Sequence, residues 1–531
     1  MAITKKTNVA RFFVLFLAAA FALFLLACGE ADISGASNNN SNSEDNTTET
    51  GGFKPLTLGI SPGNDTTELG FNWYSSGSPA DKVAQVRLME EGAEEYTESD
   101  GTVISASSGY TAHKVKVTGL EPGSSYNYQV SNNGNDWSES YSVKIPPAGA
   151  FRFAAISDPQ IVDRGRVDGS SRYPALSTFC ADGWKETVRK LVDAEVCFIA
   201  NMGDQVDNNQ NTRNEPEYTS FFAPPELRNL PFAPAVGNHD AHTNFYNHFN
   251  LPNEQFIDED IPSASVNTLL MGNYYYRYNN VLFVVLNTGV GNPSGRPAAM
   301  VYIDRFRQVL EAAKEAHAGK YDWLIVQHHK STASVANHVA DTDIQSLVEA
   351  GFETLMSEYD VNFVLAGHDH VYARSYPLEG MDNGKVSLPD KTQPGQDVTS
   401  GCTIAAAAGK PVYITFTTAS GVKYYQVSAD KTFKYNDSIT NNSSYPYLGA
   451  NADGSSTLVG SASYRQGILP VSNAVFVQPW IPSYCIVDVD STSISFKTYP
   501  AGTASGINSG AEEGYSFNEA IPYDSITVTK E

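Results

Sequence analysis

The chain has 531 residues, a formal net charge of −24 at pH 7 and 41% hydrophobic residues, which is an ordinary composition for a globular protein. Its length exceeds what one compact core needs and predicts roughly two to four domains. The acidic balance excludes nucleic acid as the expected partner, because phosphate backbones attract basic surfaces and the sequence has no stripe of Lys and Arg.

The first 27 residues predict an export signal. Lys5, Lys6 and Arg11 precede the apolar run FFVLFLAAAFALFLLA, which is on the short side for a membrane span and typical of a signal peptide. The ending LLAC resembles a bacterial lipobox, which implies a lipoprotein signal peptide over 1–27 and lipid attachment at Cys28. An uncleaved membrane anchor is the alternative. Both predict an exported protein held at the bacterial cell envelope, on its periplasmic or cell-surface side.

Residues 28–52 have almost no apolar side chains, and we expect them to form a flexible polar tether. Residues 53–147 carry short alternating apolar runs separated by Gly, Pro, Asn and Ser, which predicts a small all-β sandwich. The stretch HKVKVTGLEPGSSYNYQV within it resembles the end of a fibronectin type III domain. It has no clustered titratable groups, so we expect a rigid spacer or a binding module.

From residue 150 onward, apolar strands such as FRFAAIS, VCFIANM and VNFVLAG alternate with amphipathic helices. This pattern is typical of a layered α/β domain with helices over buried sheets. We place the domain at 150–502 and a C-terminal tail at 503–531. The polar stretches 382–409 and 428–460 are predicted surface insertions.

Apart from Cys28, the chain has four cysteines whose spacing does not match a zinc site. In an oxidising compartment they could form two disulfides, and buried free thiols are the alternative. These residues are Cys180, Cys197, Cys402 and Cys485.

Five apolar runs end in carboxylate, amide or imidazole side chains. In α/β sheets the carboxyl ends of the strands meet along one edge, where ligand sites form. His368 and His370 also lie two residues apart, so an extended segment directs both imidazoles to one side. The five endings are Asp158-Pro159-Gln160, Gly203-Asp204-Gln205-Val206-Asp207, Gly237-Asn238-His239-Asp240, His328-His329 and His368-Asp369-His370.

These side chains have the chemistry of a metal centre. Oxygen and imidazole ligands without thiolate favour Fe, Zn or Mn. The candidate ligands outnumber what one tetrahedral ion requires. The set therefore predicts two metal ions that share a carboxylate.

In this order, DPQ, GDQVD, GNHD, QHH and GHDH resemble the calcineurin-like metallophosphoesterase superfamily, and GHDHVYARSYPL after a fibronectin-like domain resembles its purple acid phosphatase branch. The resemblance implies a layered α/β (α+β) sandwich of two central β-sheets flanked by helices, preceded by the small all-β sandwich. It also implies two divalent or trivalent metal ions bridged by Asp204. Asp158 and His370 would hold one ion, and Asn238, His328 and His368 the other.

The same resemblance implies His239 and Asp240 as catalytic residues. His239 would contact a phosphoryl oxygen or protonate the leaving group. The alternative is that it supports the site through Asp240, which would then orient its ring. The implied metal ligand in the pair of adjacent histidines is His328, with His329 as the alternative.

Two positions depart from the family pattern. Gln160 stands where the superfamily commonly has a histidine, and it either coordinates a metal through its amide oxygen or leaves an open position. Asp207 stands where the purple branch has a tyrosine, so a purple ferric site is not expected.

The resemblance implies acid phosphatase-like hydrolysis of phosphate esters by in-line attack of a metal-bridging hydroxide. A nucleotidase or phosphodiesterase with the same site is one alternative, and a metal-bound surface binding protein with little activity is another. Arg374 either meets substrate anions or forms a salt bridge. His242, Tyr246 and His248 could shape a pocket, but we leave them out of the catalytic set.

Overall fold

The computed structural model describes residues 53–530 with the exception of several internal segments. The signal peptide, Cys28 and tether predicted for 1–52 lie outside the described residues, as does most of the predicted insertion 428–460. Within the described part, no helix is long and apolar enough to cross a membrane. The segments left out are 163–175, 210–213, 241, 256–270, 337, 339–340, 383–384, 388–399, 426–445, 451–455, 462–472, 480 and 503–517.

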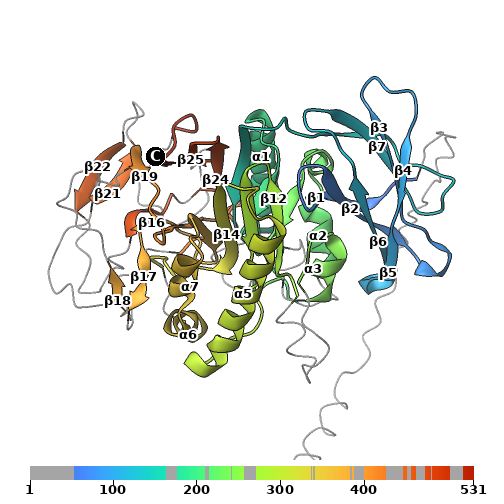
Figure 1. Cartoon of the computed structure of the whole chain (residues 1–531). Helices are drawn as coiled ribbons and strands as arrows, with labels where there is room; N and C mark the ends of the chain where they lie inside the picture. Colours follow the sequence, from blue (N-terminus) through green and yellow to red (C-terminus); the bar gives the residue numbers. More distant parts are fainter. Residues whose placement is uncertain are drawn as a thin grey trace, which may run out of the picture. The chain divides into compact units, whose positions relative to one another are not determined.

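The N-terminal part is an all-β sandwich of two four-stranded sheets (blue in Figure 1). Side chains alternate between core and solvent along β3 and β7, as expected for sheets with one buried face. The core includes Phe71, Trp73, Val86 and Tyr128. The first sheet runs β1 (Leu56–Pro62), β2 (Glu68–Ser76), β6 (Tyr110–Thr118), β5 (Thr102–Ser105), and the second β4 (Thr97–Asp100), β3 (Gln85–Glu90), β7 (Ser125–Ser131), β8 (Tyr141–Lys144). Two 3₁₀ turns, η1 (Pro79–Asp81) and η2 (Ser107–Gly109), connect strands.

Two seven-stranded sheets form the centre of the part that follows the sandwich. The first runs β11 (Phe232–Pro234), β10 (Ile199–Asn201), β9 (Phe151–Ile156), β24 (Ser483–Val489), β25 (Ser493–Pro500), β26 (Asp524–Thr529), β19 (Cys402–Ala405). The second runs β12 (Tyr274–Tyr278), β13 (Val281–Val285), β14 (Trp323–Lys330), β15 (Phe363–Gly367), β20 (Val412–Thr415), β16 (Tyr372–Pro377), β23 (Asn473–Val477). Two hairpins are separate, β17 (Glu379–Asp382) with β18 (Lys385–Ser387) and β21 (Pro446–Ala450) with β22 (Ser456–Ser461).

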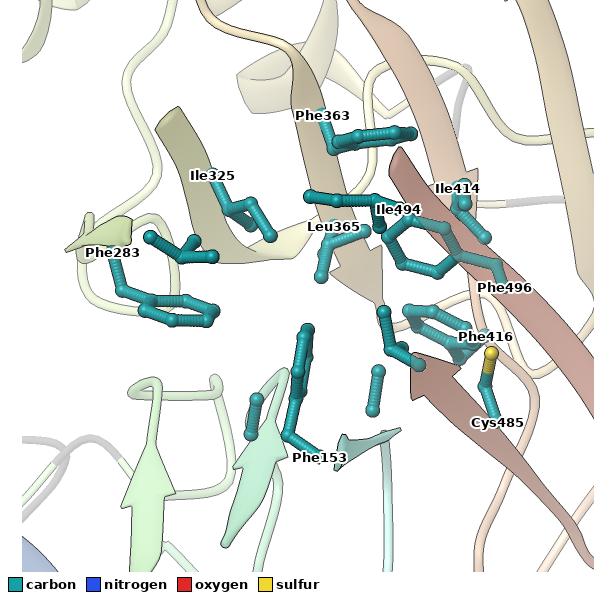
Figure 2. Packing of buried hydrophobic residues seen from close by; sticks show 14 of the residues in the cluster. Phe153, Phe283, Ile325, Phe363, Leu365, Ile414, Phe416, Cys485, Ile494 and Phe496 are labelled. Carbon is teal, nitrogen blue, oxygen red and sulfur yellow. The ribbon is translucent and has the colours of Figure 1, made fainter. Parts of the chain in front are cut away.

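The two large sheets pack face to face through one apolar core (Figure 2). Phe153 of the first sheet meets Phe283 of the second edge to face, with ring centroids 5.3 Å apart. Phe363 and Phe496 meet from opposite sheets with their rings tilted at 45° and centroids 4.6 Å apart. Such pairs of aromatic rings bury large apolar areas and fix the spacing of the sheets. The predicted sandwich of two central sheets is confirmed.

Helices cover the outer face of each sheet. In the sequence, the spacing of Trp184, Val188, Leu191 and Val192 predicts one apolar helix face. Trp184, Val188 and Leu191 of α1 pack on the first sheet, but Val192 is exposed. Ile303 and Phe306 of α5 pack on the second sheet. The first sheet is covered by α1 (Leu176–Asp193), α2 (Glu215–Phe221), η3 (Pro225–Arg228) and α3 (Thr243–His248), and the second by α5 (Arg296–Ala316), α6 (Thr342–Ala350) and α7 (Phe352–Glu358).

Two predicted boundaries are corrected by the sheet order. Residues 503–531 were expected to form a tail, but β26 lies between β25 and β19 within the first sheet, so this domain extends past residue 502. The stretch 382–409, expected to be a surface insertion, contributes β19 to the same sheet. Buried and half-buried side chains alternate along β26, as expected for a strand with one buried face, so the strand has few consecutive apolar residues.

Arg374 forms a buried salt bridge rather than a contact for substrate anions. Its Nε and Nη2 atoms donate to the two carboxylate oxygens of Asp524 in β26, at 2.6 and 3.0 Å. The Tyr372 hydroxyl donates to the same carboxylate at 2.7 Å. Both charged side chains are completely buried, so each depends on the other for its solvation.

Removing one partner of this buried pair is expected to destabilise the protein strongly. Asp524→Asn leaves the Arg374 charge buried without a counter-ion, which costs about 3–5 kcal/mol of unfolding free energy. The matched control is Asp488→Asn, which breaks a partly exposed pair with Arg152 and should cost about 1 kcal/mol or less. Urea unfolding of both variants measures the difference, and equal losses would contradict the prediction.

Candidate metal centre

The loops that follow parallel strands of both sheets meet at one place. β9, β10 and β11 are parallel neighbours in the first sheet, and β14, β15 and β20 are parallel neighbours in the second. The backbone N–H of His368 donates to the Asp158 carboxylate at 3.0 Å, which joins a loop of each sheet. The structure thus brings together the ends of β9, β10, β11, β14 and β15, as the strand endings predict.

Five of the predicted metal ligands have left-handed backbone conformations. A non-glycine residue in this region costs about 1–3 kcal/mol and persists where the surroundings determine it, commonly at functional sites. The chain therefore turns sharply at the predicted ligands that follow β9, β10 and β15. The residues and φ angles are Asp158 (49°), Gln160 (39°), Asp204 (51°), His368 (70°) and His370 (44°).

Glycines allow the loops to approach each other closely. A Cβ atom on Gly237 would lie 2.0 Å from Oδ1 of Asp204. A Cβ atom on Gly367 would lie 1.7 Å from Oγ of Ser157 and 2.6 Å from Oδ2 of Asp158. Any side chain at either position would displace a predicted ligand, because these distances are far below van der Waals contact.

His329 marks the first cation position. Its Nδ1 donates to the Met202 carbonyl oxygen at 2.8 Å, which leaves a lone pair on Nε2 when the ring is neutral. Nε2 lies 3.0 Å from Oδ1 of Asn238 and 3.3 Å from Oδ2 of Asp204. Three electron pairs that converge in this way require a positive charge, either a proton or a metal ion. Burial lowers the pKa of His329, but the charges of Asp204 and Asp158 outweigh it and raise the pKa to about 9.

His328, the predicted ligand, does not lie at this position. Successive residues of a strand point to opposite faces, so His328 shares the face of Leu324 and Val326, which α5 and α7 cover. Its ring packs on Phe352 with centroids 4.9 Å apart, and burial lowers its pKa to about 3. The prediction of His328 is therefore corrected to His329, the residue on the face between the sheets.

His370 marks a second cation position. Its Nδ1 donates to the Lys423 carbonyl oxygen at 2.8 Å, and its Nε2 lies 3.3 Å from Oδ1 of Asp158. That oxygen is buried and has no hydrogen-bond partner among the described residues. The amide oxygen of Gln160 is likewise buried without a partner, while its Nε2 donates to Asp207 at 3.1 Å. An oxygen left in this state fits coordination of a metal ion better than an open position.

Asp204 and His368 complete the arrangement. Ligand atoms of Asp204, His329 and His368 lie within 4.8 Å of one another, close enough to share one ion. Burial and the charge of His329 lower the pKa of His368 well below its usual value, so its neutral ring offers a lone pair. Burial raises the pKa of Asp204, but the charges of His329 and His239 lower it well below its usual range. The first cation position thus has an ionised carboxylate, and at each position an imidazole ring is oriented by a hydrogen bond from Nδ1 to a backbone carbonyl oxygen.

His239 lies at the side of this cluster and is partly exposed, with a quarter of its side chain open to solvent. Its backbone N–H donates to Oδ1 of Asp204 at 2.8 Å, and its Nδ1 contacts the carbonyl oxygen of Asp207. With Nδ1 held in this way, Nε2 is the ring atom available to a substrate.

Asp240, predicted as catalytic, binds backbone groups instead. Its Oδ1 accepts from Gln205 N at 2.9 Å, and its Oδ2 accepts from Gly237 N at 2.9 Å. Burial and the charge of Asp204 raise its pKa well above the usual value. The carboxyl group therefore joins the loops after β10 and β11, and the described contacts do not include the suggested one with the His239 ring.

Three further residues border the site and were missed in the sequence. The His338 ring lies at a tilt against the His368 ring with centroids 4.3 Å apart, and the backbone N–H of His338 donates to Asp369 at 2.9 Å. The Tyr425 ring lies 5.0 Å from that of His370, and Lys423 remains charged because Tyr425 and nearby carboxylates outweigh burial and raise its pKa. Lys423 and Tyr425 follow β20, which is parallel to β15, so the carboxyl end of this sixth strand was the signal for them in the sequence.

Comparison with known proteins gives two matches to family models. Residues 55–145 match the N-terminal domain of purple acid phosphatases, and residues 151–372 match the calcineurin-like phosphoesterases. The fibronectin type III resemblance itself stays a prediction.

Curated relatives and solved structures agree with these matches. The uncharacterized protein Rv2577 of Mycobacterium tuberculosis is 24% identical over 354 residues, which span 60% of this chain and 61% of that protein. Tartrate-resistant acid phosphatase type 5 of Rattus norvegicus is 24% identical over 53% of this chain and 91% of its own length. The purple acid phosphatase PPD1 from yellow lupin has the same fold, with a TM-score of 0.61 at 14% identity over 90% of this chain and 74% of its own. Residues 151–372 therefore carry a calcineurin-like phosphoesterase domain, and residues 55–145 before it carry the N-terminal domain of the purple acid phosphatases.

Proposed function

We propose that the protein hydrolyses phosphate esters with a pair of metal ions bound between its two large sheets. The observation that carries the proposal is that Nε2 of His329 and Nε2 of His370 each lie 3.3 Å from a carboxylate oxygen, of Asp204 and Asp158 respectively. The likeness to a rat protein named as an acid phosphatase supports a phosphate ester as the substrate.

The residues that would hold the metal ions divide into two groups. Asp158, His370 and Gln160 would hold one ion through oxygen and imidazole ligands, which suit Fe, Zn or Mn. Asn238, His329 and His368 would hold the other, with Asp204 shared between the two. When bound, such a pair activates water and neutralises charge on the phosphoryl group.

The protein's own residues supply orientation and a proton. The backbone N–H of His239 donates to the Asp204 carboxylate, and this hydrogen bond fixes the position of His239 relative to the carboxylate. His239 directs Nε2 toward substrate and protonates the leaving oxygen there, which contributes about 10²–10⁴-fold to turnover. Lys423 adds a cation that attracts a phosphate dianion.

His239→Ala is expected to retain both metal ions and to lose about 10²–10⁴-fold in kcat with an alkyl phosphate, whose leaving group needs a proton. Loss with p-nitrophenyl phosphate should be much smaller, because p-nitrophenolate leaves without one. Steady-state kinetics with both esters, together with metal analysis, measures the effect. Unchanged turnover of the alkyl ester would remove His239 from the mechanism.

The proposed function is tested by hydrolysis of p-nitrophenyl phosphate and bis-p-nitrophenyl phosphate, first by the metal-free protein and then with Mn, Zn or Fe added. Metal-dependent turnover supports a phosphoesterase and ranks monoester against diester. A nucleotide panel distinguishes a nucleotidase. Metal uptake without turnover of any ester would overturn the proposal in favour of a metal-bound surface binding protein.

We also propose that the protein is exported and anchored by a lipid on Cys28. The basic and apolar N-terminal segment and the LLAC sequence support this location. The polar tether 28–52 would then let the enzyme reach substrates away from the membrane. Recovery of the Cys28→Ser variant in the membrane fraction, with no lipid incorporated into the wild type, would refute the anchor.

A further inference from the structure

The N-terminal sandwich contacts the segments that follow β10 and β11. The Tyr74 hydroxyl of β2 donates to Glu215 of α2 at 3.4 Å, and the Asn250 side chain donates to carbonyl oxygens of Phe71 and Val115 at 3.3 and 3.0 Å. Gly70 allows β2 to approach the segment around Asn250 closely, because a Cβ atom at this position would lie 2.8 Å from the Asn250 carbonyl oxygen. Hydrogen bonds have directional geometry, so these contacts fix the position of the sandwich against α2 and the segment that follows α3.

A continuous chain of hydrogen bonds leads from this sandwich to the loop after Asp204. Ser107 of η2 donates its hydroxyl to Oδ1 of Asn244 at 2.5 Å, and Asn244 donates through Nδ2 to Oδ1 of Asn214 at 2.7 Å. Asn214 in turn donates through Nδ2 to the carbonyl oxygen of Asn208 at 3.2 Å. Each amide uses its oxygen on one side and its nitrogen on the other, which orders the chain in one direction.

Helix α2 makes a second connection to the same loop. Glu215 accepts from the buried His248 ring at 2.8 Å on the side of the sandwich. Two residues later, Glu217 accepts from the backbone N–H groups of Asp207 and Asn208, at 3.1 and 2.7 Å. One short helix thus links the interface with the sandwich to the backbone next to the metal centre.

The loop held in this way controls His239. The carbonyl oxygen of Asp207 contacts Nδ1 of His239, and this contact decides which ring nitrogen faces the substrate. We propose that the N-terminal sandwich is a positioning element of the active site, which orients His239 through Ser107, Asn244 and Asn214. This positioning role differs from the rigid spacer or binding module that the sequence predicts. The inference rests on the proposed function only for the experiments that measure turnover.

The proposal is tested with Ser107→Ala and Asn244→Asp in the full chain. Ser107→Ala removes the first donor, and Asn244→Asp replaces the second donor with an acceptor that faces the Asn214 oxygen. A hydrogen bond of about 1 kcal/mol predicts about a fivefold loss in kcat with an alkyl phosphate, while KM and turnover of p-nitrophenyl phosphate stay within about twofold. Ser142→Ala, an exposed hydroxyl of β8, is the control and should change neither.

A second readout does not depend on catalysis. Hydrogen exchange at the amides of Asp207 and Asn208 should become faster in both variants and stay at the wild-type rate in Ser142→Ala. Faster exchange in a protein without phosphatase turnover would support the positioning role and reject the proposed function. Exchange and ester dependence equal to those of the control would overturn the inference.

Discussion

Asp204→Asn is expected to abolish phosphoester hydrolysis, with a loss of about 10³-fold or more in kcat/KM. Asp204 is buried and ionised, one of its carboxylate oxygens faces His329, and the other accepts from the backbone N–H of His239. The asparagine is nearly identical in shape, but it carries no charge and presents an N–H₂ group to one of its neighbours. Several kcal/mol of charge stabilisation disappear with the carboxylate, and each 1.36 kcal/mol changes the rate tenfold.

Turnover of p-nitrophenyl phosphate and the number of metal ions per chain measure this result. The control is Asp193→Asn, which removes a carboxylate from the exposed end of α1, where it pairs with Arg189, and should leave both quantities unchanged. An Asp204→Asn variant within tenfold of the wild type would exclude this carboxylate as a shared ligand.

His329→Leu and His328→Leu are expected to have opposite consequences although the residues are adjacent. His329→Leu removes the Nε2 ligand atom from the first cation position and should cost one metal ion and about a hundredfold or more in turnover. Mutation of residues that only hydrogen-bond to metal ligands already lowers metal affinity or activity about 10–100-fold. His328→Leu replaces a ring packed on Phe352 by an apolar side chain. It should retain metal and activity.

Each variant serves as the control of the other, because both remove an imidazole from the same strand. Metal analysis and turnover are measured on protein whose circular dichroism matches the wild type. Loss of metal in His328→Leu with retention in His329→Leu would restore the assignment made from the sequence.

The residues at the strand ends predicted the location of the site, and the reason applies to parallel sheets in general. Parallel strands place their carboxyl ends at one edge, so Asp158, Asp204 and Asn238 had to lie close together once the strands were recognised. The choice between His328 and His329 required a different kind of information, namely which face of β14 looks toward the other sheet. Motif order carries no such information, and alternation does not supply it either, because every residue of β14 is buried and both of its faces are apolar.

Other features depended on contacts between distant segments. Asp240 has the composition of a catalytic acid, and only its three-dimensional contacts show that it binds backbone N–H groups. β26 follows a long polar segment and could not be assigned to the sheet without its partner strands. The cysteines illustrate the same limit, because both proposed states were compatible with the sequence, and in the structure all four remain thiols.

The position of β26 has a consequence for the order of events during biosynthesis. Its Asp524 lies 150 residues after Arg374, and until it emerges the guanidinium that follows the His368-Asp369-His370 motif has no counter-ion. A growing chain therefore has an incomplete first sheet until β26 has been synthesised, and non-local pairings of this kind form slowly. A metal centre built on both sheets would therefore mature only after β26 has paired with β25 and β19.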